Sequence, residues 1–178
     1  MPGVLALDLA TVAGWAWGRV PERVMSPLEA AQARPPAPLG GAHRISRAGA
    51  SVGLFLSDAE DWLNELCDQH GPVGLIYEKP ILDSFRTGFE TALKLGSLAG
   101  LASMVACRRG IHVFEPVQPS TLKKHWTGSG KADKPAMIAA CRTRGWEPVD
   151  DNHADALALW DYAGAVIAKE RRGRRQAA

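Results

Sequence analysis

Three acidic residues stand in apolar surroundings, where an unpartnered carboxylate is costly. Asp8 interrupts the apolar run 4–10, Glu78 ends the apolar run 73–78, and Asp155 begins the stretch DALALW. Burying a lone carboxylate costs on the order of several kcal/mol unless it is paired or binds a metal ion. The simpler alternatives are an edge strand that turns Asp8 toward water, and a strand end at which Glu78 leaves the core. Metal binding is the interpretation that explains all three together.

Asp155 follows a polar cluster, Asp150, Asp151 and Asn152. Residues three or four apart share one face of a helix, so Asp151 or Asn152 can act beside Asp155. Asp and Asn are also favoured at helix N-termini, and capping explains at least one residue of the cluster. Capping does not explain Asp155, which lies a full turn further on. His153, between them, is expected to face solvent.

Carboxylate and amide oxygens are hard ligands that suit Mg²⁺, with Mn²⁺ as a substitute. Two such ions, about 3.5–4 Å apart, would activate a water and stabilise the leaving 3′ oxygen of a phosphodiester. The candidate metal ligands are Asp8, Glu78, Asp151, Asn152 and Asp155, and the four acids among them are the candidate catalytic residues. This chemistry is that of a metal-dependent nuclease.

The elements that must position these residues follow from hydrophobic periodicity and turn signals. We expect a hairpin over 4–10 and 14–18, further strands at 41–48, 73–78 and 111–116, and helices at 51–70, 87–109, 120–124, 134–144 and from about 150 onward. A three-strand meander followed by crossovers predicts a five-stranded mixed sheet with helices on both faces. That arrangement is the ribonuclease-H-like fold.

The chain has 178 residues, of which 46% are hydrophobic and 22% charged, as in an ordinary globular domain. We expect one domain over 1–168, with a proline-rich loop insertion at 21–40 and a basic, disordered tail at 169–178. No apolar run approaches the ~18 residues of a membrane helix, and the N-terminus does not resemble a signal peptide. The three cysteines form no CxxC pair. A cytoplasmic protein without membrane contact is therefore expected.

Charge is unevenly distributed along the chain. The segment 79–144 carries a formal charge of +7, whereas 1–78 carries −4 and 145–168 carries −5. This pattern suits an enzyme whose carboxylates gather metal while its lysines and arginines hold a polyanion. Chance segregation of charges on solvated faces is the alternative.

The sequence resembles the RuvC-type Holliday junction resolvases over about residues 4–168. The resemblance rests on LALDLATVAGWA, YEKP followed by ALKLGSLAG, TGSGKADKPAMIAA and DDNHADALAL. It implies that Asp8, Glu78 and Asp155 match three of the family's four metal-binding carboxylates. The fourth position, an acid or His in the family, is Asn152 here, and we favour Asp151 as the source of the missing charge. This departure and the proline-rich insertion suggest a divergent, phage-type member.

The resemblance also implies residues that contact DNA and a partner copy. Lysines around the Gly-Ser-Gly loop would hold the DNA backbone, and the stretch after Glu78 would probe the junction centre; this set is Lys79, Ile81, Phe85, Arg86, Lys123, Lys124, Lys131 and Lys134. The second long helix would form a homodimer through Phe89, Leu93, Gly96 and Gly100. Packing within the chain's own core is the alternative for that stripe.

These features predict a homodimeric endodeoxyribonuclease that resolves four-way junctions by paired symmetric nicks. Two other functions fit the same residues. One is a nuclease of other branched or RNA-containing substrates such as flaps and forks. The other is a junction-binding protein whose metal site is weakened by Asn152. A sugar-kinase-like fold is excluded, because 178 residues cannot supply its second nucleotide-binding half.

Overall fold

A computed structural model describes residues 3–20, 29, 32–33, 36–82, 85 and 88–176. Its strands are β1 (Gly3–Asp8), β2 (Val12–Arg19), β3 (Leu39–Arg44), β4 (Gly74–Tyr77) and β5 (His112–Val113). Its long helices are α2 (Val52–His70), α4 (Phe89–Arg108) and α7 (Asp151–Gln176), and the shorter α5 (Pro119–Thr127) and α6 (Lys134–Thr143) lie between the last strand and α7.

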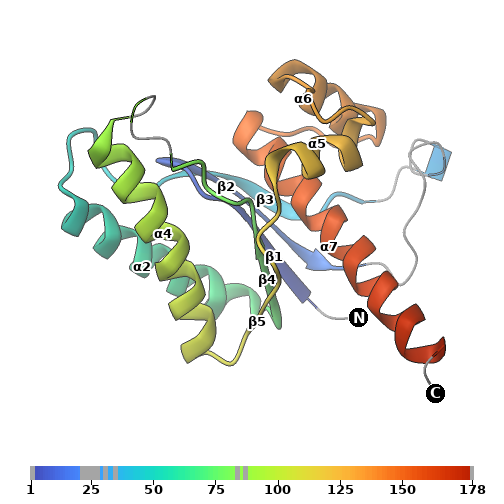
Figure 1. Cartoon of the computed structure of the whole chain (residues 1–178), viewed down its shortest axis with the longest axis horizontal. Coiled ribbons are helices and arrows are strands. Elements are labelled where there is room, and N and C mark those ends of the chain that lie inside the picture. Colours follow the sequence, from blue (N-terminus) through green and yellow to red (C-terminus); the bar gives the residue numbers. More distant parts are fainter. Residues whose placement is uncertain are drawn as a thin grey trace.

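The strands form one mixed sheet in the order β3-β2-β1-β4-β5. β1 pairs antiparallel with β2 and parallel with β4, while β2–β3 is antiparallel and β4–β5 is parallel. Helices α2 and α4 cover one face, and α7 crosses the other (Figure 1). The predicted five-stranded sheet with helices on both faces is therefore confirmed, with β1 at its centre.

Strand alternation divides the interior into two cores. Leu5 and Leu7 of β1 pack in the core beneath α2 and α4, whereas Val4 and Ala6 pack in the core beneath α7. In the core beneath α7, small side chains allow the helix to pack close to the strands of the sheet. Trp160 of α7 donates from its indole nitrogen to the Gly18 carbonyl at 3.1 Å, and buried alanines line the same side of the helix.

Helix α2 shows why its limits could be predicted closely. Ser51 caps its N-terminus, accepting a hydrogen bond from the Leu54 amide at 3.3 Å. Gly71 ends it in the left-handed conformation, at φ 55°, that glycine adopts without steric cost. The observed helix begins and ends within one residue of the predicted range.

Several predicted boundaries differ from the structure. The helix expected at 120–124 is α5, Pro119–Thr127, and the first strand ends at Asp8 rather than at residue 10. The third strand lies at Leu39–Arg44 rather than 41–48, and the last strand is only His112–Val113, followed by an isolated bridge between Glu78 and Val117. The tail predicted to be disordered from 169 onward instead continues α7 to Gln176. Lys, Glu and Arg are good helix formers, so they extend a helix that tertiary packing has already nucleated.

The predicted loop insertion at 21–40 lies mostly outside the described residues, and β3 begins at its end. Within the part of the chain that the structure describes, no helix is both long enough and apolar enough to cross a membrane.

Candidate active site

The central strands place Asp8 and Glu78 at neighbouring positions. Asp8 is the last residue of β1, and Glu78 directly follows β4. Leu7 and Tyr77 are partners in the parallel register, and the Glu78 amide donates to the Leu7 carbonyl at 3.3 Å. Because side chains alternate along a strand, Asp8 and Glu78 lie on the same face as Ala6 and Ile76, which is the α7 face.

Helix α7 brings Asp155 to this face through an unusually close contact. Gly14 of β2 pairs with Asp8 across the β1–β2 ladder. A Cβ atom added at Gly14 would lie 1.9 Å from the backbone oxygen of Asn152, so only glycine allows the first turn of α7 to rest there. A glycine inside a strand is a known signal of close backbone approach. Sequence reasoning did not use this signal, and Gly14 was missed as a residue that shapes the site.

The three carboxylates perturb one another. Burial, followed by repulsion from Asp155, Glu78 and Asp151, raises the pKa of Asp8 well above its usual value. Burial is also the main reason that the pKa of Glu78 rises to about 7, with Asp155 adding to it. The pKa of Asp155 rises to about 6, again chiefly through burial. Ionising these carboxylates therefore costs free energy, and a bound cation would lower that cost.

The donor set suits a hard divalent cation. Oδ1 of Asp155 is buried and has no hydrogen-bond partner among the described residues. A buried carboxylate oxygen without a partner calls for a proton or a cation, and carboxylates are the ligands that Mg²⁺ and Mn²⁺ prefer. Among the residues described, however, no group of three or more His, Cys, Asp or Glu side chains is arranged to hold a metal ion. The carboxylates are thus gathered without a closed coordination shell.

The polar cluster at the start of α7 divides into different roles. Asp150 is a cap, because its Oδ1 accepts from the His153 amide at 2.8 Å. Asp151 forms an ion pair with Lys134, the first residue of α6, and this hydrogen bond lowers the pKa of Asp151. Asn152 is half-buried, with its backbone oxygen against Gly14. Asp151 is therefore near the site but already paired with a cation.

His153 is buried, with 7% of its surface exposed, so the expectation that it faces solvent is wrong. Its Nδ1 accepts from the Val149 amide at 3.1 Å. Its Nε2 would lie 2.6 Å from a Cβ at Gly40, so the missing side chain on β3 makes room for the ring. The absence of a side chain at Gly40 on β3 therefore explains why His153 is buried rather than exposed to solvent.

The predicted DNA-contacting lysines are not equivalent in the structure. Lys123 on α5 is half-buried and lowers the pKa of both Glu78 and Asp155. Lys134 lowers the pKa of Asp8 and Asp155. Lys79, Lys124 and Lys131 are exposed, as is Lys134, but the charges of the first three are not among those that shift the pKa of these three carboxylates. The charges of Lys123 and Lys134 therefore act on the carboxylates themselves, which spacing along the sequence did not reveal.

Apolar side chains are exposed after β4 and at the start of α4. The most exposed are Ile81 at 63%, Phe89 at 74% and Phe85, which is fully exposed. Leu82 and Leu93 are also exposed, and a Cβ at Gly96 would lie 3.3 Å from the Leu82 side chain. Around Gly100 a Cβ would meet no atom within 4 Å. Arg86 lies outside the described residues.

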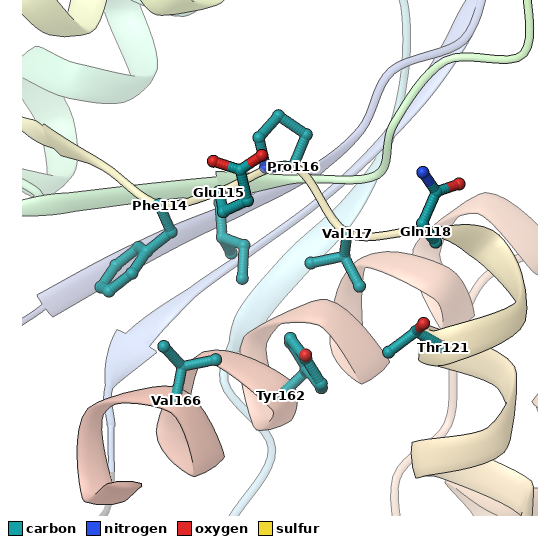
Figure 2. A pocket seen from close by; sticks show the side chains of 9 residues that line it. Phe114, Glu115, Pro116, Val117, Gln118, Thr121, Tyr162 and Val166 are labelled. Atoms are coloured by element: carbon teal, nitrogen blue, oxygen red, sulfur yellow. The ribbon is translucent and has the colours of Figure 1, made fainter. Parts of the chain in front are cut away.

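A cavity of about 210 Å³ lies elsewhere on the α7 face. Figure 2 shows Tyr162 and Val166 of α7 facing Phe114 and Val117, which follow β5. The lining includes neither Asp8 nor Glu78 nor Asp155, so this cavity is separate from the carboxylates.

No protein-family model matches the chain, but curated relatives do. The crossover junction endodeoxyribonuclease RuvC of Anaeromyxobacter sp. (strain Fw109-5) is 36% identical over 114 residues, which cover 64% of this chain and 53% of that protein. The protein of the same name from Pseudothermotoga lettingae is 32% identical over 112 residues, or 61% of this chain and 67% of that one. The chain thus spans little more than half of the first relative and two thirds of the second.

Solved structures extend the match to nearly the whole chain. The structure described as T. thermophilus RuvC in complex with Holliday junction substrate superposes with a TM-score of 0.71 at 18% identity, covering 93% of this chain and 95% of that one. This likeness confirms the predicted ribonuclease-H-like fold.

Proposed function

The chain belongs to the RuvC family of crossover junction endodeoxyribonucleases, and we propose that it is a metal-dependent nuclease that resolves four-way DNA junctions. The observation that carries the proposal is the convergence of Asp8, Glu78 and Asp155 on the α7 face. The pKa values of these carboxylates are raised, and Oδ1 of Asp155 has no hydrogen-bond partner among the described residues. Both properties are expected of carboxylates that a bound cation would stabilise in their ionised form.

In this proposal Asp8, Glu78 and Asp155 hold two Mg²⁺ ions, for which Mn²⁺ can substitute. When bound, the ions supply activation of the attacking water and stabilisation of the leaving 3′ oxygen. Asp151 provides the fourth ligand after it separates from Lys134, and the Asn152 side-chain oxygen is the alternative donor. Lys134, once separated, is then available to a phosphate oxygen of the DNA.

The DNA backbone would be held by lysines on both sides of the carboxylates. Lys123 and Lys134 are close enough to influence the acids electrostatically, so they would meet the scissile phosphate. The exposed Lys79, Lys124 and Lys131 would contact phosphates further away. The exposed Ile81 and Phe85 would enter the opened junction centre as apolar wedges, and the charge of Arg86 would act beside them on the DNA.

A homodimer would explain how one small domain makes paired cuts. Phe89 and Leu93 expose apolar surface on α4, and Gly100 leaves that helix open to close approach, whereas Gly96 lies against the Leu82 side chain of the same copy. A two-fold dimer presents two sites related by the symmetry of a four-way junction. The T. thermophilus RuvC structure, described as a complex with Holliday junction substrate, supports this substrate class.

A junction-binding protein without cleavage is the second candidate function. It is favoured by Asn152 at a metal-ligand position and by the Lys134–Asp151 ion pair, which together reduce the negative charge available to a second ion. A nuclease that cuts forks or RNA-containing duplexes would use the same carboxylates. Only the substrate that it cleaves would distinguish it from a nuclease of four-way junctions.

The test is a gel assay with purified protein, Mg²⁺ and a synthetic four-way junction beside a linear duplex and a three-way fork. Paired nicks near the junction centre, absent with Asp155→Asn, are the expected result. Binding without cutting, in Mg²⁺ and again in Mn²⁺, would favour the junction-binding function. Cutting confined to the fork or to an RNA-containing duplex would change the assigned substrate.

A further inference from the structure

A hydrogen bond joins α5 to α7 outside the carboxylate site. His125 Nε2 and Asp161 Oδ2 are 2.8 Å apart, and only 21% and 25% of the two side chains are exposed. The His125 ring also packs edge-on against Tyr162, with centroids 5.2 Å apart and planes at 84°. Partial burial and ring packing restrict the imidazole, so this contact fixes how the two helices meet.

The contact lies on the flank of α5 opposite to Lys123. Leu122 and Trp126 form the buried stripe of this nine-residue helix. At about 100° per residue, Lys123 and His125 lie about 80° to either side of the midline of that stripe. A short helix held mainly along one stripe can roll about its own axis. The Trp126 indole nitrogen holds the stripe itself by donating to the Met137 carbonyl at 3.3 Å, and a bond on one flank is a second constraint on where the opposite flank points.

Helix α7 provides the fixed reference for both flanks. Asp155 and Asp161 are six residues apart on it, or about 9 Å along its axis. Asp161 binds His125, and the charge of Lys123 acts on Asp155 and on Glu78. One rigid helix thus carries both the anchor of α5 and an acid that Lys123 faces.

We propose that His125 is a positioning residue, whose hydrogen bond to Asp161 holds α5 in the roll angle that keeps Lys123 against Glu78 and Asp155. This role rests on the proposed nuclease function and deepens it, because it assigns the orientation of a lysine that acts on the carboxylates to a contact outside the site. The contacts of His125 that carry the proposal are with Asp161 and Tyr162.

Mn²⁺ binding measured by titration calorimetry tests the proposal without any cleavage. Lys123→Ala removes a positive charge near the carboxylates and should tighten Mn²⁺ binding roughly fivefold. His125→Ala and Asp161→Ala should each tighten it by a similar factor, because each lets Lys123 move away. His125→Ala combined with Lys123→Ala should bind Mn²⁺ no more tightly than Lys123→Ala alone, since no charge is left to misplace.

Two further variants separate positioning from general destabilisation. His125→Gln keeps a donor near the position of Nε2 and should return Mn²⁺ affinity close to that of the wild type. Arg109→Ala breaks a different cross-helix ion pair, Arg109–Asp68 on the α2/α4 face, and should leave Mn²⁺ affinity unchanged. The proposal is overturned if His125→Ala leaves Mn²⁺ affinity unchanged, or tightens it equally in the Lys123→Ala background.

Cleavage gives an independent readout. With a four-way junction in Mg²⁺, His125→Ala should slow single-turnover cutting on the order of tenfold, as misplacement of a catalytic group does. Its junction affinity in Ca²⁺ should stay within about twofold of the wild type, because the charge of Lys123 is retained. Failure of the wild type to cut branched DNA would count against the proposed function alone, since the Mn²⁺ cycle reports the position of Lys123 directly.

Discussion

The two faces of the sheet are built from the same strands but differ in composition and chemistry. Beneath α2 and α4, β1 contributes Leu5 and Leu7 to a dry apolar core. Beneath α7, the same strand contributes Val4, Ala6 and finally Asp8. The first face gains stability from large buried side chains. On the second face β1 itself contributes smaller side chains, and large buried ones such as Trp126 and Trp160 come from α5 and α7.

This difference shows how a residue's position on a pleated strand determines its role. Leu7 and Asp8 are consecutive in sequence, yet their side chains lie on opposite sides of the sheet. Tyr77 and Glu78 at the end of β4 repeat the pattern, since Tyr77 packs beneath α4 and Glu78 lies with Asp8. Stability and catalysis can therefore be altered separately by changing neighbouring residues.

Asp8→Asn is expected to have the largest effect, lowering the cleavage rate while raising the free energy of unfolding. Loss of one carboxylate from the proposed metal site should reduce junction cutting on the order of 10³-fold while junction binding persists. Burial raises the pKa of Asp8, so its ionised form opposes folding, and the neutral amide should increase the free energy of unfolding at pH 8. Single-turnover cleavage and urea unfolding measure both effects. If this variant cut junctions at the normal rate, Asp8 would not be a residue of the proposed metal site.

Leu7→Ala should produce the opposite result. Leu7 is fully buried in the α2/α4 core, so its truncation should lower the free energy of unfolding by about 3 kcal/mol. Cutting per folded molecule should remain within about threefold of the wild type at a temperature where the variant is folded. Urea unfolding and an active-site-normalised cleavage assay check this. A loss of cutting as large as that of Asp8→Asn would mean that the two faces are not separable.

Stability should also depend on pH through the α7 face. The pKa of Glu78 is raised to about 7 and that of Asp155 to about 6, so both protonated forms favour folding. The stabilisation is complete below their unfolded values, near 4, and is lost as pH rises through 7. For the metal-free protein we expect the free energy of unfolding to fall by about 4 kcal/mol between pH 5 and pH 8 from these two groups.

The comparison with Glu78→Gln isolates this contribution. Burial lowers the pKa of His153, which acts in the opposite direction over the same pH range. The difference in unfolding free energy between wild type and Glu78→Gln removes the His153 contribution, because both proteins retain that histidine. A pH-independent difference would contradict the raised pKa of Glu78. Saturating Mg²⁺ should reduce the pH dependence, since bound cations compensate the ionised carboxylates.

The smallest expected difference is between the cleavage rates of two variants at the start of α7. Asp151→Asn removes a charge beside the proposed metal ligands and should slow cutting about tenfold. Asp150→Asn keeps an oxygen that caps the His153 amide, so its cutting rate should stay within about twofold. Cleavage rates of the two variants, measured side by side, decide whether Asp151 takes part. Equal effects would make Asn152 the better candidate for the fourth ligand.

Local patterns predicted the parts of the fold that are determined locally. The helix over 51–70 has a clear apolar period, a Ser cap and a terminal Gly, and the strand that carries Asp8 is a short, continuous apolar run. Asp8 and Glu78 were recognisable because a charge inside an apolar run needs a partner. These features require no knowledge of distant contacts.

Features that depend on distant contacts were not predictable in the same way. His153 is buried because Gly40 on another strand leaves room, and Lys123 faces the carboxylates because α5 packs on α7. The basic segment after 168 is helical because it continues a packed helix, although its composition resembles a disordered tail. In each case the deciding neighbour is far away in the sequence.

The close seating of α7 on Gly14 has a consequence for biosynthesis. Asp8 and Glu78 are synthesised before Asp155, which comes from a helix that follows all five strands in the described chain. The emerging polypeptide can pair β1 with β2 and β4 but cannot complete the carboxylate cluster until α7 has been synthesised and has docked. If the proposed nuclease function holds, a chain that still lacks α7 is catalytically silent.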